Sequence, residues 1–182
     1  MMIRFAFNEK KTTQAAAFLI NEGGGKINYT KLIKLLYLAD RKALNEWERP
    51  ISGDSYVAMR NGPVLSTTYD LINYPDDSYW HRHIKRDEYD VALFDDPGTS
   101  SLTKNELKVL KTTSDEHKYH DWRDMIQFCH DCCDEWQHPG NTSIPIHIED
   151  IFKVLEKTDR EIEIIEDDIS TINYAKLIFG IA

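Results

Sequence analysis

The stretch from Lys31 to Val64 reads KLIKLLYLADRKALNEWERPISGDSYVAMRNGPV, and its pattern decides the fold. Its first part repeats apolar residues at spacings of three and four, the period of a helix that buries one face: Leu32, Leu36, Ala39, Ala43 and Trp47. Three further apolar residues widen this face: Ile33, Tyr37 and Leu44. The spacing therefore predicts a helix from about Asn28 to Trp47 at the centre of the core, packed on more than one side.

A proline break and a glycine-proline corner follow this helix. Pro50 ends the helical pattern, and the β-branched and aromatic residues of Ser55–Met59 predict a short strand. Gly62 can adopt backbone angles that other residues resist, and Pro63 excludes the helical region for the residue before it while suiting the first turn of a helix. We therefore expect Pro63 to begin a helix, PVLSTTYDLINY, and the corner itself to be architectural.

Helices and one hairpin are expected on both sides of this region. A helix over Thr13–Glu22 is predicted by strong helix formers followed by a glycine triplet. Large and polar residues alternate about a polar break between Tyr79 and Phe94, which predicts an antiparallel hairpin. Thr103 with Glu106 three residues later is a capping box and marks a helix start. Further helices are expected over Trp122–Trp136 and Ile148–Ile165.

This order of elements predicts a mainly α fold with a small antiparallel β-sheet, an α+β arrangement. A length of 182 residues fits one compact domain with a sizeable core, so a single domain over residues 1–182 is expected. The content of 41% hydrophobic and 29% charged residues is typical of a globular chain and excludes a disordered or membrane-embedded one.

The sequence predicts a cytoplasmic protein without a cofactor. No apolar run is long enough to span a bilayer, and the first residues, MMIRFAFNEKKT, have no signal-peptide pattern. Three clustered cysteines, Cys129, Cys132 and Cys133, do not suit a disulfide framework. The segment EGGGK lacks the spacing and the Ser or Thr of a phosphate-binding loop, so no nucleotide is expected.

The net charge of −9 argues against a protein that follows nucleic-acid phosphates, which normally shows a basic stripe. The charge is uneven: residues 1–50 carry nine Lys/Arg and five Asp/Glu, whereas residues 101–182 carry nine and seventeen. An acidic second half suits a protein partner with a basic surface. A solvated surface that keeps the chain soluble explains the same pattern.

Part of the sequence resembles the signature of the Panacea-domain family, which includes the SocA antitoxin and phage-associated GepA-like proteins. The matching positions are Tyr29, Lys31, Leu32, Lys34, Leu35, Leu36, Tyr37, Ala39, Leu44, Pro50, Ile51, Ala58, Gly62, Pro63, Val64 and Tyr69. A looser similarity extends the resemblance to about Asn28–Ile165 and includes His130 and Trp136 in FCHDCCDEW. The cysteine cluster and the acidic tail region depart from the pattern.

The resemblance implies an antitoxin that neutralises a cognate protein toxin, encoded by a neighbouring gene, through direct binding. A protease is a further implied partner, since one member delivers its toxin to a protease. Neither a membrane nor a nucleic acid is expected as a partner. Within the signature, a structural role is expected for Lys31, Tyr37, Gly62, Pro63 and Val64.

Aromatic and basic residues near the corner and the predicted hairpin are the candidate contacts for the toxin: Tyr56, Arg60, Tyr79, Trp80 and His81. Such side chains dominate the energetics of protein interfaces. Burial in the core is the alternative interpretation for Tyr56 and Trp80.

A zinc site is one alternative, because His117 and His120 precede Cys129 and Cys132 in an order that zinc sites use. Against it, Cys129 lies beside Phe128 on a predicted helix, where free cysteine commonly packs as a small hydrophobe. A nucleophilic cysteine at Cys132 or Cys133 lacks any local activating signature.

A metal-independent ribonuclease of the HEPN type is the other alternative function. Arg123 and His130 are seven positions apart, so both lie on one helix face and would flank a phosphate, with the imidazole as acid or base. A packed or hydrogen-bonded His130 explains the same residue. We therefore place a binding protein ahead of an enzyme.

Overall fold

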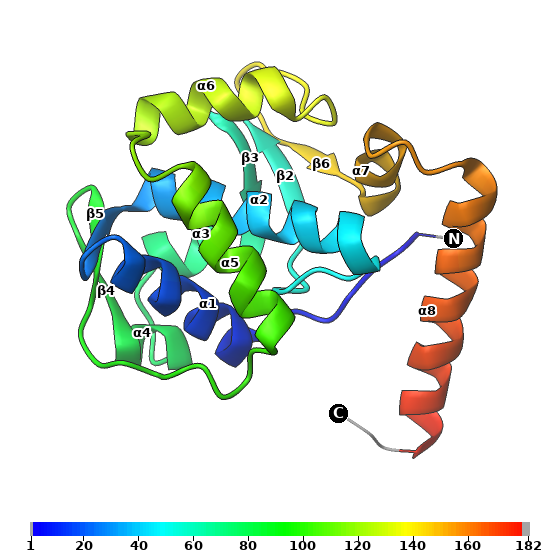
Figure 1. Cartoon of the computed structure of the whole chain (residues 1–182), viewed down its shortest axis with the longest axis horizontal. Coiled ribbons are helices and arrows are strands. Elements are labelled where there is room, and N and C mark those ends of the chain that lie inside the picture. Colours follow the sequence, from blue (N-terminus) through cyan, green and yellow to red (C-terminus); the bar gives the residue numbers. More distant parts are fainter. Residues whose placement is uncertain (1, 180–182) are drawn as a thin grey trace.

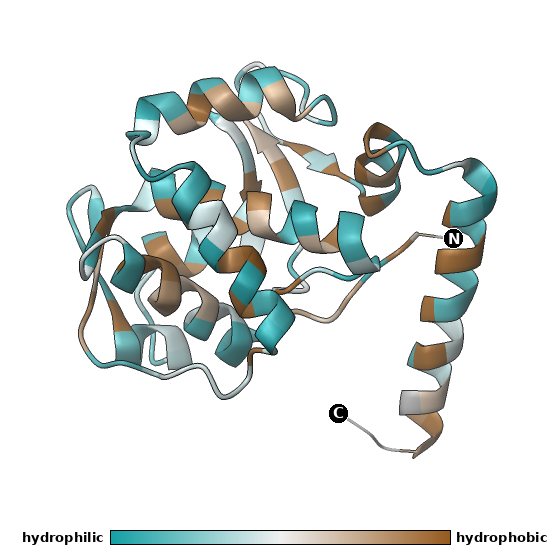
Figure 2. Cartoon of the chain, viewed as in Figure 1, coloured by the Kyte–Doolittle hydropathy of each residue, from teal (hydrophilic) through white to brown (hydrophobic). Residues whose placement is uncertain are grey.

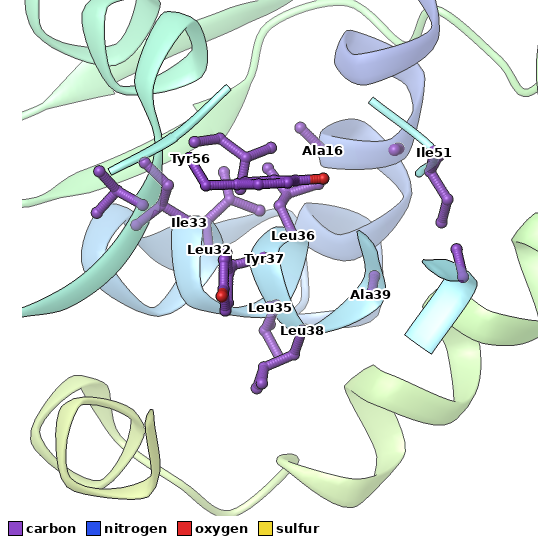
Figure 3. Packing of buried hydrophobic residues seen from close by; sticks show 14 of the residues in the cluster. Ala16, Leu32, Ile33, Leu35, Leu36, Tyr37, Leu38, Ala39, Ile51 and Tyr56 are labelled. Atoms are coloured by element: carbon purple, nitrogen blue, oxygen red, sulfur yellow. The ribbon is translucent and has the colours of Figure 1, made fainter. Parts of the chain in front are cut away.

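The computed structural model of the protein describes residues 2–179, with the side chain of Lys176 excepted, and it is built around one helix (Figure 1). This helix, α2 (Tyr29–Trp47), begins where the Asn28 side chain accepts hydrogen bonds from the amides of Thr30 and Lys31. Its side chains from Leu32 to Ala39 are all buried, and Figure 3 shows the hydrophobic ones pointing to several sides. The prediction of a central helix is confirmed.

Other helices surround α2. Five of them contact it directly: α1 (Glu9–Glu22), α3 (Ser66–Asn73), α5 (Lys104–Glu116), α6 (Trp122–Cys132) and α7 (Ile148–Val154). The first starts earlier than the expected Thr13, because the Asn8 side chain caps it by accepting from the Lys11 amide. The predicted capping box of Thr103 and Glu106 is present at the start of α5. Within residues 2–179, no helix combines the length and the hydrophobicity needed to cross a bilayer.

The strands of residues 2–179 form two small antiparallel sheets in place of the one expected. One sheet has the order β1 (Lys26–Asn28), β5 (Asp90–Leu93), β4 (Ile84–Asp87). The other has the order β3 (Gly62–Leu65), β2 (Tyr56–Met59), β6 (Ile144–Ile146). The mainly helical α+β class is confirmed. The sequence pattern missed β1, β3 and β6, which are only three or four residues long. Strands β1 and β6 pair with segments far along the chain, whereas β3 pairs with the adjacent β2.

The predicted helix start at Pro63 is wrong. Pro63 lies in β3 opposite Ala58, and the chain makes a hairpin in which only Arg60 and Asn61 separate the strands. Helix α3 (Ser66–Asn73) begins after the strand, because the Asp54 carboxylate accepts hydrogen bonds from the amides of Thr67 and Thr68. The buried carboxylate that sets the start of this helix comes from a different segment, so the residues around Ser66 do not indicate it.

The predicted hairpin from Tyr79 to Phe94 is correct only in its second half. Residues 79–83 form a helix, α4 (Tyr79–His83), and β4 and β5 follow. The Ser78 side chain caps α4, and the Trp80 amide donates to Glu9 Oε1 at 2.9 Å. Trp80 is 1% exposed, so its burial against the core decides the conformation here.

Two of the later helices also have other bounds than expected. Helix α6 ends at Cys132 and does not reach Trp136, since the following loop turns back towards α2. The segment predicted as one helix from Ile148 to Ile165 is divided into α7 and α8 (Asp159–Phe179). The break contains Glu156 at φ 63, and the side chains and amides of Thr158 and Glu161 then form a capping box.

Candidate partner-binding site

Helix α2 carries polar side chains that hold distant segments in place. The Lys31 ammonium donates hydrogen bonds to the carbonyls of His117, Lys118 and His120, at distances of 3.0, 3.3 and 2.6 Å. These carbonyls lie just after α5, at the negative end of its dipole, which a cation complements. Lys31 therefore fixes the end of α5 against α2.

Lys34, one turn further along α2, holds the β2–β3 hairpin. Its side chain is buried, and its Nζ donates to the Pro63 carbonyl at 2.6 Å. Burial lowers the pKa of Lys34 to about 8, because the ammonium has lost much of its water. The neighbouring Gly62 has φ 96, and a Cβ at that position would lie 2.9 Å from Lys34 Nζ. The glycine therefore provides both the backbone angle and the room for this contact.

Tyr37 and Arg41 bind the loop that follows α6. The Tyr37 hydroxyl donates to Glu135 Oε1 at 2.7 Å, and Arg41 Nε donates to the same oxygen at 2.8 Å. Burial, with the Glu135 charge, raises the pKa of Tyr37, so the phenol stays protonated and acts as a donor. In the same loop, Trp136 Nε1 donates to the Met59 carbonyl at 2.9 Å. The loop thereby ties α2 to the hairpin.

Asp40 is the fifth residue of α2 that holds a distant segment in place. Its carboxylate accepts hydrogen bonds from the amides of Ile51 and Ser52, at 2.8 and 3.0 Å, and from the Tyr56 hydroxyl at 3.0 Å; the Ser52 hydroxyl donates to it as well. Burial nevertheless raises the pKa of Asp40 to about 6. Tyr37, which donates to Glu135, and Tyr56, which donates to Asp40, pack edge to face with ring centroids 5.4 Å apart (Figure 3).

A small pocket of about 120 Å³ opens beside the tip of this anchored hairpin. Side chains from α2, the hairpin and α3 line it: Tyr29, Thr30, Ile33, Lys34, Met59, Arg60, Asn61, Val64 and Tyr69. Arg60 and Asn61 are exposed at the tip, whereas Val64 and Lys34 are buried. The pocket thus combines a fixed interior with an accessible, partly cationic edge.

Tyrosines and a second arginine continue this edge. The Arg86 guanidinium lies over the Tyr29 ring, 4.5 Å from its centroid, and donates a hydrogen bond to the Asn73 side chain. Burial, together with the nearby Tyr29 and Tyr74, raises the pKa of Tyr69, while the Arg86 charge acts in the opposite direction. We name this surface the hairpin face: Tyr29, Arg60, Asn61, Tyr69, Tyr74 and Arg86.

One comparison with known protein families gives a match. The family model described as antitoxin SocA-like, Panacea domain, matches residues 32–137, more than half of the chain. The chain belongs to this family. No curated protein and no solved structure shows significant similarity to it.

We call the helix α2 and the segments that its polar side chains hold in place the frame. The Panacea match covers most of this frame. It begins just after Lys31 and ends just after Glu135 and Trp136, so it includes the hairpin, α5 and α6. Helices α7 and α8 lie outside it. The residues expected to be structural sit inside the frame: Lys31 and Tyr37 bind distant loops, while Gly62, Pro63 and Val64 form the buried strand of the hairpin.

The structure divides the five residues predicted to contact a toxin. Arg60 is exposed on the hairpin face, but Tyr56 and Trp80 are 2% and 1% exposed and belong to the core. Tyr79 and His81 are half-buried on α4, which packs against α1, and His81 Nδ1 lies 2.7 Å from Asp76 Oδ1. Sequence reasoning overlooked Arg86 and Tyr74 as surface residues. A signal for the face was present in the signature positions Tyr29 and Tyr69.

The residues of the zinc alternative do not converge. His117 and His120 lie close, with their Nδ1 atoms 3.0 Å apart, but Cys129 is buried and Cys132 is exposed. Within residues 2–179, no three His, Cys, Asp or Glu side chains are grouped as metal ligands. Cys129 and Cys133 are free thiols that influence each other: the Cys133 thiol, with Lys34 nearby, lowers the pKa of Cys129, and the Cys129 thiol together with burial raises the pKa of Cys133.

The two residues of the ribonuclease alternative each have another contact. The Arg123 guanidinium stacks on the Trp122 ring, 4.4 Å from its centroid. The His130 ring is stacked on Trp136 with centroids 4.0 Å apart and an interplanar angle of 12°. Burial lowers the pKa of His130, so the imidazole is mostly neutral near pH 7. His130 therefore supports the tryptophan that donates to Met59.

Proposed function

We propose that this protein is a cytoplasmic antitoxin that neutralises a cognate protein toxin, encoded by a neighbouring gene, by binding it through the hairpin face. The observation that carries the proposal is an accessible arginine and tyrosine edge around a pocket, mounted on a hairpin that buried contacts hold to the central helix. Membership of an antitoxin-like family supports the same function.

The anchoring of the hairpin matters for affinity. Association costs conformational entropy whenever a loop must be ordered, and a surface that is already ordered avoids that cost. The Pro63 carbonyl is bonded to Lys34 and the Met59 carbonyl to Trp136, so both strands are held just before and after the exposed tip. The hairpin face is therefore preorganised, as a binding surface requires.

The composition of the face indicates what it binds. Arginine and tyrosine are enriched among the residues that carry most of the binding energy of interfaces, since each presents a large contact area with a polar end. Arg60 and Arg86 favour carboxylates or carbonyl oxygens on the partner. A pocket of about 120 Å³ suits a single side chain of the toxin.

The first experiment expresses the neighbouring open reading frame from an inducible promoter, with and without this protein. Growth is scored, and the two proteins are then co-purified. Toxicity that is relieved together with a stable complex supports the proposal. A harmless neighbour that forms no complex contradicts it at this locus, and RNA cleavage with Arg123 and His130 variants then becomes the relevant assay.

Three variants locate the surface. Arg60→Ala is expected to weaken the complex at least tenfold with an unchanged melting temperature, because Arg60 is exposed at the hairpin tip. Arg82→Ala is the matched control, an exposed arginine on α4. Trp80→Ala is expected to lower the melting temperature and the binding together, because Trp80 is buried. If only Arg82→Ala weakens the complex, the toxin binds at α4 and not at the hairpin face.

Transfer of the bound toxin to a protease is a second step that the family resemblance suggests. It is tested by the lifetime of the toxin in cells. A lifetime that shortens when this protein is present supports an adaptor role, whereas an unchanged lifetime together with neutralisation supports binding alone.

A further inference from the structure

Helix α8 has one face buried against the rest of the chain and one face without cover. Ile162, Ile165 and Ile169 recur at spacings of three and four and are 5–7% exposed. In the last two turns, Tyr174, Leu177, Ile178 and Phe179 are 66, 80, 57 and 73% exposed. Figure 2 shows hydrophobic colour returning at this end of α8, where Figure 1 shows the helix extending along the edge of the molecule.

The exposed side chains have the spacing of a docking helix. Positions i, i+3 and i+4 lie on one face of a helix, and helices that bind in grooves use such triplets as anchors. Three adjacent large apolar side chains in water are also unfavourable, and contiguous exposed patches of this kind mark interaction sites. Tyr174, Leu177 and Ile178 therefore form a candidate contact surface, which we name the α8 outer face together with Glu163 and Asp167.

The two carboxylates indicate the charge of the occupant. Glu163 and Asp167 precede Tyr174 by eleven and seven positions, about three and two helical turns, so they lie on the same side of the helix. Both are exposed. Residues 159–179 carry six Asp or Glu against one Arg and one Lys. A groove that accepts this face must be apolar where it meets the last turns and basic where it meets the middle of α8.

This charge pattern disfavours two other occupants. A second copy of α8 packed in parallel would place carboxylate against carboxylate, and an antiparallel copy would bury Glu163 and Asp167 against apolar side chains without partners. A membrane leaflet with anionic lipids would repel the same carboxylates. A protein with a basic-rimmed apolar groove satisfies both halves of the α8 outer face.

The surroundings of α8 leave this face accessible and fix its direction. Before the helix begins, Lys157 Nζ lies 2.8 Å from Glu48 Oε1 and ties the connection to the end of α2. Beyond Ile169, a pocket of about 480 Å³ separates α8 from the remaining structure, with Ile172 and Asn173 on one wall and Phe5 on the other. The last turns therefore present the α8 outer face to solvent.

We propose that the α8 outer face inserts into an apolar, basic-rimmed groove on the toxin and forms a contact separate from the hairpin face. The proposal rests on the proposed antitoxin function. Because α8 lies outside the Panacea match, it adds to the common frame an element that selects this chain's own partner.

The test measures the affinity of the full-length protein for the product of the neighbouring gene by titration. Leu177→Ser is expected to weaken the complex at least tenfold. Ile164→Ser, the matched control, removes an exposed apolar side chain from an earlier turn of the same helix and is expected to change affinity less than threefold. Glu163→Lys with Asp167→Lys is expected to weaken binding and to reduce its sensitivity to salt. Circular dichroism checks that each variant keeps its helix content.

The outcomes separate this inference from the function on which it rests. A wild-type complex whose affinity Leu177→Ser leaves unchanged overturns the α8 contact and leaves the antitoxin function intact. A wild-type protein that binds nothing from the neighbouring gene overturns both. Sedimentation that shows a wild-type dimer and a Leu177→Ser monomer overturns the toxin groove, since α8 would then pair with its own copy.

Discussion

Asp40 joins the central helix to the segment that leads into the hairpin. Its carboxylate lies on the central helix and bonds the amides of Ile51 and Ser52 and the hydroxyl of Tyr56, at the start of the hairpin sheet. Lys34 does the same for the Pro63 carbonyl. At the residue scale, the antitoxin-like frame is a set of buried polar contacts that begin on α2 and end on loops.

Removing Asp40 should cost much of the stability. Asp40→Ala removes the acceptor of two buried amides and of the hydroxyls of Ser52 and Tyr56, and we expect it to lower the free energy of unfolding by about 3 kcal/mol. Asp40→Asn keeps an acceptor and a donor in place and should cost less. Chemical denaturation at pH 7 measures both; equal losses for the two variants would contradict the hydrogen-bond account.

The pH dependence follows from the same carboxyl. Its pKa of about 6 in the folded chain is above that of an unfolded aspartate, so protonation stabilises the fold. This contribution is complete below about pH 4 and is lost as the pH rises through 6, a change of about 3 kcal/mol. Asp40→Asn should remove it, so the stability difference between the variant and the wild type should shift over this window. A constant difference from pH 4 to 7 would contradict the prediction.

Gly62 is predicted to be a position where no side chain fits. Gly62→Ala meets a positive φ and the Lys34 ammonium, and we expect a loss of at least about 2 kcal/mol in the free energy of unfolding. Gly24→Ala is the control, because Gly24 has φ 89 but no atom near its missing Cβ, so about 1 kcal/mol is expected there. Equal losses would show that the approach of Lys34 costs nothing.

At the scale of the elements, a helix start with a local cap was predicted, whereas conformations that depend on distant contacts were not. The start of α5 was predicted correctly because its capping box lies within four residues. The start of α3 was not, since its cap is Asp54, more than ten residues upstream. The helix α4 was read as a strand because its conformation depends on burying Trp80 and on the contact with Glu9. The break before α8 had a local signal, Thr158 and Glu161, that the sequence analysis missed.

The capping box of α5 makes a direct prediction. Thr103→Ala should lower the free energy of unfolding by about 1 kcal/mol, because it leaves the Glu106 amide unpaired. Thr112→Ala, on the exposed side of the same helix, should change it by less than about 0.5 kcal/mol. Thermal unfolding of the two variants compares them, and similar effects would mean that the cap does not stabilise the chain.

At the scale of the whole molecule, two surfaces of opposite charge stand apart from the buried frame. The hairpin face carries Arg60 and Arg86, and the α8 outer face carries Glu163 and Asp167. The frame itself connects α2 to both, through Lys34 for the hairpin and through Glu48 and Lys157 for α8. A toxin that contacts both surfaces must present an acidic region and a basic one.

If both surfaces bind the same toxin, their contributions should add. The double variant Arg60→Ala with Leu177→Ser should weaken the complex by the product of the two single effects, within about 0.5 kcal/mol, because the sites share no contacts. Titration of the single and double variants against the wild type measures this. If the double variant binds the toxin as tightly as the single variant with the lower affinity, the two surfaces are not used together.

From the sequence alone, the central helix and the capping box of α5 were predicted correctly, because each depends on residues that are close together in the chain. The mainly α class and the family resemblance followed from such local patterns repeated along the chain. The hairpin at Gly62–Pro63, the burial of Tyr56 and Trp80, the partners of Lys34 and Glu135, and the grouping of Tyr29, Arg60 and Arg86 were decided by the tertiary structure alone. The physical reason is that burial, and the pairing of buried polar groups, depend on segments far apart in sequence.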